Sequence, residues 1–457
     1  MTSVVLHTPP SAWWQPASRR APAPAQSTSR VAFGALVSFT AILLLSPQAW
    51  IPILGTLRIA FVVAAIAIGA HLLTQLLRAR DLPAMPAEIV LAFLLAGWAM
   101  LTLPLSMWPG GSAVVLTDKY LKAVAFFWLI GTLATTADRL RVLTWTFVLG
   151  SIPLATTAVK NYFTGEVLST GVAGFTRVTG YVGGSNIAAN PNDLALVLNL
   201  TIPLAAALVV MSRRTSARLV AAGALLLAVV AVVLTFSRAG FLALAATTLA
   251  SVAYMARRGA PGKAAALLIA ALVALPFLPE SYVGRLSTIT NIEEDETGSA
   301  QGRWRDTKIA ATVLLKNPVI GAGIGQDVLV MNDERGRDTW RRVHNVYLQY
   351  GVDLGFPGML LFIALHVMCY GAAREAERRS QLPTPNAPTS KTPTPNLGAG
   401  NLGVGSSELA PLAAAVKVSL IAFGVEAMFH PIAYNFYFFS VGGLAVALRG
   451  AAQHKGA

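Results

Sequence analysis

The sequence predicts an all-α polytopic membrane protein with about twelve transmembrane helices and one large polar loop that contains short amphipathic helices. Hydrophobic residues make up 55% of the chain and charged residues only 12%, whereas about a quarter of a soluble domain is charged. The mean hydropathy is +0.60. Apolar runs also recur that are long enough to cross a bilayer, which takes about 20 residues. In a membrane protein the positions of the basic residues matter more than their total. The net charge of +14 therefore does not indicate nucleic-acid binding.

Twelve apolar runs are candidate spans. The stretch from Leu219 to Met255 is too long for one helix, and a lone arginine is costly at the bilayer centre. We therefore predict two helices that separate at Ser237–Arg238, with Arg238 at a membrane surface. The predicted spans lie near residues 31–46, 51–77, 86–105, 115–136, 142–160, 191–211, 218–236, 239–256, 263–279, 344–371, 410–430 and 432–449.

The short connections alternate in charge. Every second connection is basic, and cytoplasmic loops carry an excess of lysine and arginine. This alternation predicts that both termini lie in the cytoplasm. The basic connections hold Arg78 and Arg80; Arg139 and Arg141; Arg213, Arg214 and Arg218; Arg257, Arg258 and Lys263; and Arg374, Arg378, Arg379 and Lys391.

The predicted organisation has six parts. Two long outer segments are expected, near 161–190 and at 280–343. In the second, residues 305–318 have helical apolar spacing that Pro318 would end. The only cysteine, Cys369, excludes an intrachain disulfide. The parts are a disordered cytoplasmic tail without a signal peptide (1–30), nine transmembrane helices (31–279), the outer loop (280–343), a tenth helix (344–371), a low-complexity cytoplasmic linker (372–409), and the last two helices with a cytoplasmic tail (410–457).

Two of the six histidines are expected at the outer face. His344 precedes the tenth helix, and His430 precedes Pro431 at a turn. Imidazole titrates near neutrality and is the usual general base. The alternative is that His344 is an interfacial ring that caps its helix and that His430 serves the turn.

Arginines gather at the same face. The planar guanidinium fork matches phosphate oxygens, although single outer-loop arginines often only face solvent or headgroups. Arg238 differs from these because it sits in a tight turn between two apolar helices. The others are Arg177, Arg303, Arg305, Arg341 and Arg342.

Three further motifs are expected to be structural. "NPND" (190–193) is a helix start, with Asn190 as cap and Pro191 at the first position, although such a terminus also attracts anions. "GAGIGQD" (321–327) follows a predicted helix rather than a strand, so we reject a nucleotide loop and expect a flexible turn. "EEDE" (293–296) is expected to be solvated rather than metal-binding.

Three segments together resemble a known family. "LTFSRAGFLALA" (234–245), "GRWRDTKIAATVLLKNPVIGAGIG" (302–325) and "HNVYLQYGVDLGFPGMLLF" (344–362) are similar to the core of bacterial O-antigen ligases and the related O-antigen polymerases, over roughly residues 170–370. The resemblance implies a metal-independent, inverting, membrane-embedded glycosyltransferase without a cofactor. Its implied donor is a glycan on undecaprenyl pyrophosphate at the periplasmic face of the inner membrane, and its implied acceptor is a lipid A–core sugar hydroxyl in lipopolysaccharide biosynthesis.

The resemblance also assigns roles to residues. It implies that His344 is the general base and that Arg238 and Arg303 bind the pyrophosphate. Arg305 is the alternative to Arg303, and Arg177 is a further candidate for the donor. Candidates for supporting roles are Asn345, Tyr347, Arg342 and His430.

Three functions remain open from the sequence. A ligase and a polymerase share these motifs and differ in the acceptor; we favour the ligase because one long loop is followed at once by the compact segment that begins with His344. The third is a transporter of lipid-linked glycans. Transporters place charges near the bilayer midplane and show internal repeats. Here only Lys417 and Glu426 are expected to be buried, and no repeat is evident.

Overall fold

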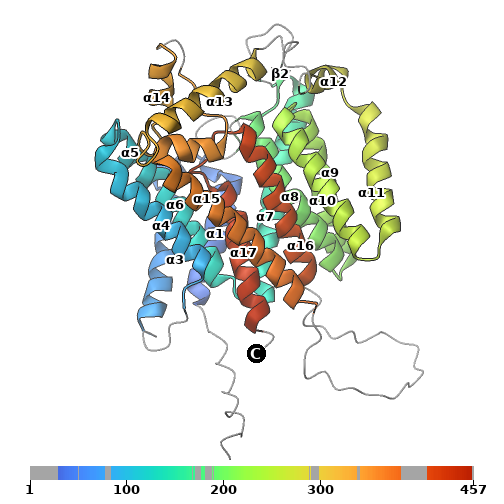
Figure 1. Ribbon diagram of the computed structural model, residues 1–457. Coiled ribbons are helices and arrows are strands. Elements are labelled where there is room, and N and C mark those ends of the chain that lie inside the picture. The colour runs from blue at the N-terminus through green and yellow to red at the C-terminus, as the bar shows by residue number, and fades with distance from the viewer. Residues whose placement is uncertain are drawn as a thin grey trace, which may run out of the picture.

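The computed structural model describes residues 29–49, 51–77, 84–166, 168–169, 176–180, 188, 190–287, 289, 298–336, 340–381 and 409–454. These residues form an all-α membrane protein (Figure 1). Besides the helices they contain one short antiparallel pair, β1 (Leu168–Ser169) and β2 (Thr176–Arg177). The predicted tail before Ser29, the EEDE segment and linker residues 382–408 lie outside the described residues.

Each of the twelve predicted spans contains a helix. Eight helices in the described part of the chain are long and apolar enough to cross a membrane, and α1 and α11 are shorter apolar helices. The twelve are α1 (Arg30–Leu45), α3 (Ile59–Leu76), α4 (Ala87–Thr102), α6 (Leu121–Leu133), α7 (Ala137–Thr164), α8 (Pro191–Met211), α9 (Thr215–Leu234), α10 (Arg238–Arg257), α11 (Pro261–Ala274), α15 (Val346–Arg379), α16 (Leu409–Glu426) and α17 (Phe436–His454).

Short helical segments complete the bundle. A π-helical turn, Leu116–Tyr120, joins α5 to α6. The α-helices are α2 (Pro52–Thr56), α5 (Pro109–Val115), α12 (Glu280–Ser287), α13 (Ser299–Lys316) and α14 (Asp327–Glu334). The 3-10 turns are Pro47–Ala49, Leu103–Leu105, Leu275–Phe277 and Ala427–Phe429.

Burial separates a central helix from peripheral ones. All residues of α8 from Leu194 to Ala205 are buried, as expected for a helix that is apolar on every side and enclosed by others. In contrast, α11 buries only Ala264, and α3 buries only Ala67 and His71. Their exposed apolar faces suit contact with lipid.

The predicted break at Ser237–Arg238 is confirmed. Helix α9 ends at Leu234 and α10 begins at Arg238, where the Ser237 hydroxyl accepts the Gly240 N–H at 3.1 Å. Between the helices, Phe236 has φ 51°, a left-handed conformation that is unfavourable for a bulky residue. Its ring packs edge-on against Tyr282 and stacks with Tyr162. Aromatic packing therefore holds the strained turn.

The polar loop folds as helices at one end of the bundle. Figure 1 shows α12, α13, α14 and β2 at this end, which we call the loop end, and the C-terminus at the other. Helix α13 begins earlier than the predicted start at residue 305 and stops before Pro318, as expected. Its buried face joins α14 and α15 in a small core of Ala310, Val313, Ala322, Val330, Met331, Val343 and Val352.

Helix α15 is kinked, which the sequence analysis did not predict. Gly355 has φ 69° and ψ −175°, so two helical segments meet there. Pro357 has no N–H group and cannot donate a backbone hydrogen bond. The neighbouring Phe356 N–H donates outside the helix, to the Pro318 carbonyl at 2.7 Å. The glycine-rich turn is fixed to the same kink, because Ala322 and Gly323 donate to the carbonyls of Val352 and Asp353 at 2.8 Å. It is a packed turn rather than a flexible one.

Candidate active site at the loop end of the bundle

Arg238 is the first residue of α10, and its side chain is buried (8% exposed). The backbone beside it is fixed from outside the turn, because the Tyr282 hydroxyl donates to the Ser237 carbonyl at 3.0 Å. The start of α10, and with it the Arg238 backbone, is therefore fixed in position.

Arg177 reaches the same turn from β2. Its Nη2 donates to Asn192 Oδ1 at 2.8 Å, and its Nε donates to the Thr235 carbonyl at 3.3 Å. The Ser237 hydroxyl donates to the same amide oxygen at 2.8 Å. Asn192 therefore ties β2 and the α9–α10 turn to the first turn of α8, and it brings Arg177 close to Arg238 in the fold.

The NPND segment starts α8, as predicted. Asn190 Oδ1 accepts the N–H groups of Asn192 and Asp193 at 2.9 Å, and Pro191 is the first helical residue. The Asp193 carboxylate points to His430, whose Nε2 lies 3.1 Å from Oδ1. His430 is only 3% exposed. From the sequence, NPND was expected only to start a helix, and the contact could not be predicted because residues 193 and 430 are far apart in the chain.

His344 is half-buried just before α15. Burial lowers the pKa of its ring to about 4, and the charges of Arg303, His430 and Arg341 act in the same direction, against a hydrogen bond with the Arg342 backbone. The charges of Arg303 of α13 and of His430 therefore both disfavour a proton on this ring. The ring is consequently neutral at physiological pH and able to accept a proton.

The capping alternative for His344 is wrong. Asn345 is the N-cap of α15, and its Oδ1 accepts the Leu348 N–H at 3.0 Å. This contact gives Asn345 a structural role. His344 precedes this cap, so it lies outside the helix.

Helical phase separates Arg303 from Arg305. Residues two positions apart on a helix point in nearly opposite directions. Arg303 is half-buried and shares its face of α13 with the buried Asp306 and Ala310, whereas Arg305 is exposed. Arg303 thus lies on the inward face of α13 and its charge acts on the His344 ring, whereas Arg305 lies on the exposed face.

A buried ion pair holds the segment that leads to His344. Arg335 Nη2 lies 2.7 Å from Asp306 Oδ1, and both side chains are 3% exposed. Arg335 Nη1 also donates to the Arg341 carbonyl at 3.1 Å. On the other side, Asp327 Oδ2 accepts the Val343 N–H at 3.0 Å. These contacts, which the sequence analysis did not anticipate, fix the ring relative to α13.

Two candidates for supporting roles turn away from His344. The Tyr347 hydroxyl donates to the Gly424 carbonyl at 3.3 Å, and its ring stacks with His366 inside the bundle. Arg342 Nη1 lies 4.0 Å from Asp327 Oδ1. Both side chains contribute to the packing around His344 and do not contact its ring in these interactions.

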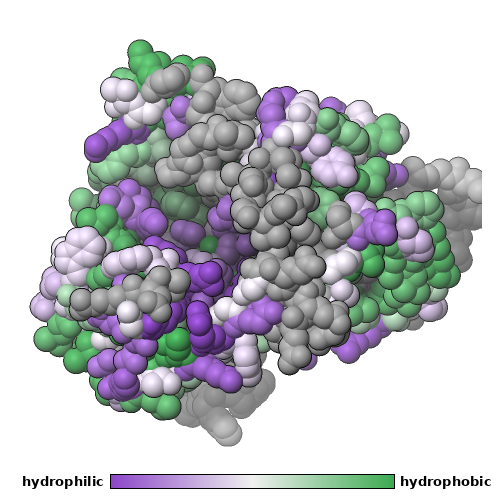
Figure 2. Space-filling view, turned by 90° about the horizontal axis from the view of Figure 1, so that it is seen from above, coloured by the Kyte–Doolittle hydropathy of each residue, from purple (hydrophilic) through white to green (hydrophobic). Residues whose placement is uncertain are grey.

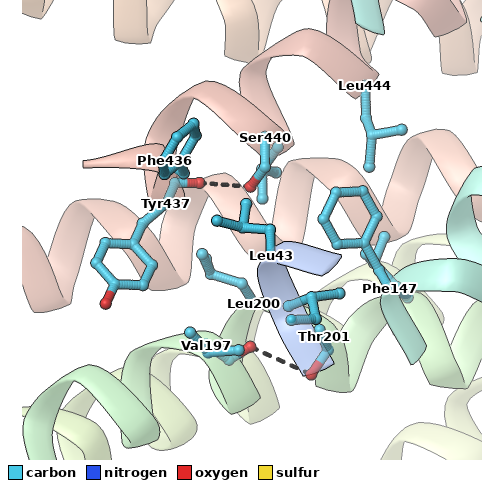
Figure 3. A pocket seen from close by; sticks show the side chains of 12 residues that line it. Leu43, Phe147, Val197, Leu200, Thr201, Phe436, Tyr437, Ser440 and Leu444 are labelled. Carbon is cyan, nitrogen blue, oxygen red and sulfur yellow. Dashed lines mark hydrogen bonds between the residues drawn. The ribbon is translucent and has the colours of Figure 1, made fainter. Parts of the chain in front are cut away.

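The loop end is hollowed and polar. Figure 2 shows hydrophilic side chains gathered around a hollow in this face. The small cavity of about 30 Å³ in Figure 3 is different: mostly apolar side chains of α1, α7, α8 and α17 line it, and it has room for water but not for a sugar. A larger groove of about 1020 Å³ lies between α1, α3 and α6 and is mainly apolar.

Comparison with known families fits this geometry. Residues 197–363 match the family model described as O-antigen ligase. Over this segment the chain is similar to the O-antigen ligase family. No curated protein matches the chain.

The O-antigen ligase segment covers only part of the loop-end cluster. It contains Arg238, Arg303 and His344, which come from α10, α13 and the start of α15. Asp193 and His430 lie outside it in sequence, and the charge of His430 acts on the His344 ring. The family match and the geometry are therefore separate observations about the same end of the bundle.

Proposed function

We propose that the protein is an O-antigen ligase-like, inverting glycosyltransferase that does not require a metal. It moves a glycan from undecaprenyl pyrophosphate to a sugar hydroxyl of lipid A–core at the periplasmic face of the inner membrane. The observation that carries this proposal is that a neutral, half-buried His344 lies at the polar loop end together with the half-buried Arg303 and the buried Arg238.

Arg238 and Arg303 bind the donor pyrophosphate in this proposal, and Arg177 supports them. Negative charge grows on the leaving pyrophosphate in the transition state, so fixed cations accelerate its departure. Guanidinium forks contact two oxygens at once. Arg177 and Arg238 lie at the same turn, and contacts already in the fold hold that turn.

His344 acts as the general base. A sugar hydroxyl is a weak nucleophile, and a positioned base removes its proton as the new glycosidic bond forms. The attack comes from the side opposite the pyrophosphate and inverts the anomeric centre. A ring that is already neutral near pH 7 needs no prior deprotonation.

The apolar groove between α1, α3 and α6 supports a lipid-linked donor. Its volume of about 1020 Å³ is at the upper end for ligand pockets, and its lining is mainly apolar. The transporter alternative is less well supported. Several charges within the described helices form pairs that join neighbouring helices, such as Glu88 with Arg449 and Glu377 with Lys417.

Transfer by purified protein in lipid nanodiscs tests the proposal. The assay supplies an undecaprenyl-pyrophosphate-linked glycan with either lipid A–core or a second glycan as acceptor. We expect transfer to lipid A–core that falls by about 10²-fold or more in His344→Gln, within the range for a lost general base. Arg303→Ala should also lose activity. Arg305→Ala is the matched control, because it removes the same side chain from the exposed face of α13.

The outcomes separate the alternatives. Extension of the second glycan alone would identify a polymerase. Equal losses in Arg303→Ala and Arg305→Ala would remove the geometric argument for Arg303. Arg238→Lys keeps the charge and loses the fork, so we expect a clear loss there too; wild-type turnover by Arg238→Ala would reject the pyrophosphate assignment.

A further inference from the structure

One face of α8 holds the start of α10. Asn192, Ala195 and Asn199 are three and four positions apart, so they lie on the same side of the helix, and α8 and α10 lie side by side (Figure 1). Each of the three residues contacts either the cap of α10 or its first turn. We call this set of residues the α8 face.

Two members of the α8 face fix Gly240. The Asn199 amide donates to the Gly240 carbonyl at 2.9 Å and to Oε2 of the fully buried Glu426 of α16 at 3.3 Å. The helices also approach closely here, because a Cβ at Gly240 would lie 2.6 Å from the Ala195 Cβ. The first turn of α10, which begins with Arg238, is therefore fixed against both α8 and α16.

Asn192 is the member of the α8 face that contacts both arginine segments. Its Oδ1 accepts hydrogen bonds from Arg177 Nη2 and from the Ser237 hydroxyl, each at 2.8 Å. The same hydroxyl accepts the Gly240 N–H and caps α10, whose first residue is Arg238. One amide oxygen thus fixes the position of Arg177 directly and that of Arg238 through the helix cap.

A neutral amide suits this position. Its oxygen has two lone pairs and can accept two hydrogen bonds. Unlike a carboxylate, it does not neutralise the Arg177 guanidinium that donates to it. Cations that are already fixed in place stabilise a growing negative charge without a cost of reorganisation. The contacts of Asn192 therefore order two cations and keep their charge.

We propose that Asn192 is a positioning residue that holds Arg177 and Arg238 at a fixed separation, so that both reach the donor pyrophosphate. The inference rests on the proposed function, which assigns the pyrophosphate to these arginines. Asn192 acts through the arginines and needs no contact with the substrate. Its loss should weaken binding of the donor and leave binding of the acceptor unchanged.

Binding of undecaprenyl pyrophosphate to Asn192→Ala in nanodiscs tests the inference without catalysis. We expect its Kd to rise by about tenfold, as for the loss of one hydrogen bond to a charged group. In the transfer assay the donor KM should rise and the acceptor KM should not. A merely structural role would lower the amount of active protein and leave both KM values as they are. Wild-type affinity in folded Asn192→Ala would overturn the inference.

Thr201→Ala is the matched control in the same helix. Thr201 is also buried (4% exposed), but its hydroxyl donates to the Val197 and Leu198 carbonyls of α8 itself. We expect wild-type affinity for undecaprenyl pyrophosphate in this variant. A loss equal to that of Asn192→Ala would show that donor binding responds to any polar deletion in α8, and the specific role of Asn192 would be lost.

A double-mutant cycle measures whether Asn192 acts through Arg177. The Kd for undecaprenyl pyrophosphate is compared in Asn192→Ala, Arg177→Ala and the double variant. Residues in contact give non-additive effects, so the loss in the double variant should be clearly smaller than the product of the two single losses. Single losses that multiply would show that the two residues act independently, against the inference.

A second substitution keeps the inference testable if Asn192→Ala does not fold. Asn192→Asp keeps oxygens for Arg177 and Ser237, and a carboxylate suits the first turn of a helix, so its Tm should stay near that of the wild type. Its negative charge competes with the pyrophosphate for Arg177. We therefore expect a Kd that is higher by about tenfold or more. Unchanged donor affinity in this variant would count against the positioning role.

The two proposals can fail separately. If Arg238→Ala binds undecaprenyl pyrophosphate as tightly as the wild type does, the proposed function loses its pyrophosphate assignment. If Arg238→Ala and Arg177→Ala bind it poorly while both Asn192 variants bind it normally, only the positioning role of Asn192 is rejected.

Discussion

At the scale of single residues, the environment of His344 decides its chemistry. Burial, with Arg303 as the next contribution, holds its pKa at about 4, below the ordinary value of about 6.5. Between these pH values the folded protein binds fewer protons at this ring than the unfolded chain does. The ring therefore contributes stability above pH 6.5, and this contribution is lost as the pH falls toward 4.

This pKa predicts the acid limb of the reaction. At pH 5.5 a free imidazole is mostly protonated, but His344 should still be mostly neutral and active as a base. Wild-type turnover should therefore stay near its neutral-pH value down to about pH 5 and fall by roughly half near pH 4, after correction for unfolded protein. A limb centred near pH 6.5 would contradict the depressed pKa.

The sequence allowed us to predict which residues lie at the loop end, but not which of them contact one another. Arg238 could be identified from the sequence alone, because an arginine buried between apolar helices is energetically costly. Asp193 could not be paired with His430 in the same way, because a fold, and not a local pattern, brings residues 193 and 430 together. Helical phase could have separated Arg303 from Arg305 in advance.

At the scale of elements, the kink in α15 links the loop to the membrane helix. Gly355 has φ 69°, and a Cβ there would lie 2.2 Å from the Val319 carbonyl oxygen. Apolar length predicted the helices well because hydrophobicity alone decides which segments enter a bilayer. It did not predict the kink, which depends on Pro357 together with the distant Pro318 carbonyl.

A single methyl group at the kink tests its importance. Gly355→Ala should destabilise the protein by about 1–3 kcal/mol, the usual cost of a strained backbone, and lower its Tm. Gly371→Ala is the matched control in the same helix: its Cβ meets nothing within 4 Å, and alanine favours helix by up to about 1 kcal/mol. Thermal unfolding of both variants in detergent measures this. Equal Tm values would contradict a structural role for the kink.

At the scale of the whole molecule, the basic residues predicted for the inner loops lie at the end opposite His344. Helix α15 begins beside His344 and ends at Arg379. Contacts join other charged residues at that far end: Arg258 pairs with Glu377, Arg449 pairs with Glu88, and Arg139 lies over the Phe33 ring. One end of the bundle is therefore basic and the other carries the proposed site.

This separation predicts the orientation of the protein in the membrane. The positive-inside rule puts the basic end in the cytoplasm, and the loop end then faces the periplasm, where a lipid-linked donor is used. Ser287 of α12 and Ser216 of α9 are exposed at the two ends, and the native Cys369 is fully buried. With a membrane-impermeant maleimide, Ser287→Cys should be labelled in intact spheroplasts, and Ser216→Cys only after the membrane is opened. Labelling of Ser216→Cys alone in intact spheroplasts would place His344 in the cytoplasm and end the proposal of periplasmic transfer.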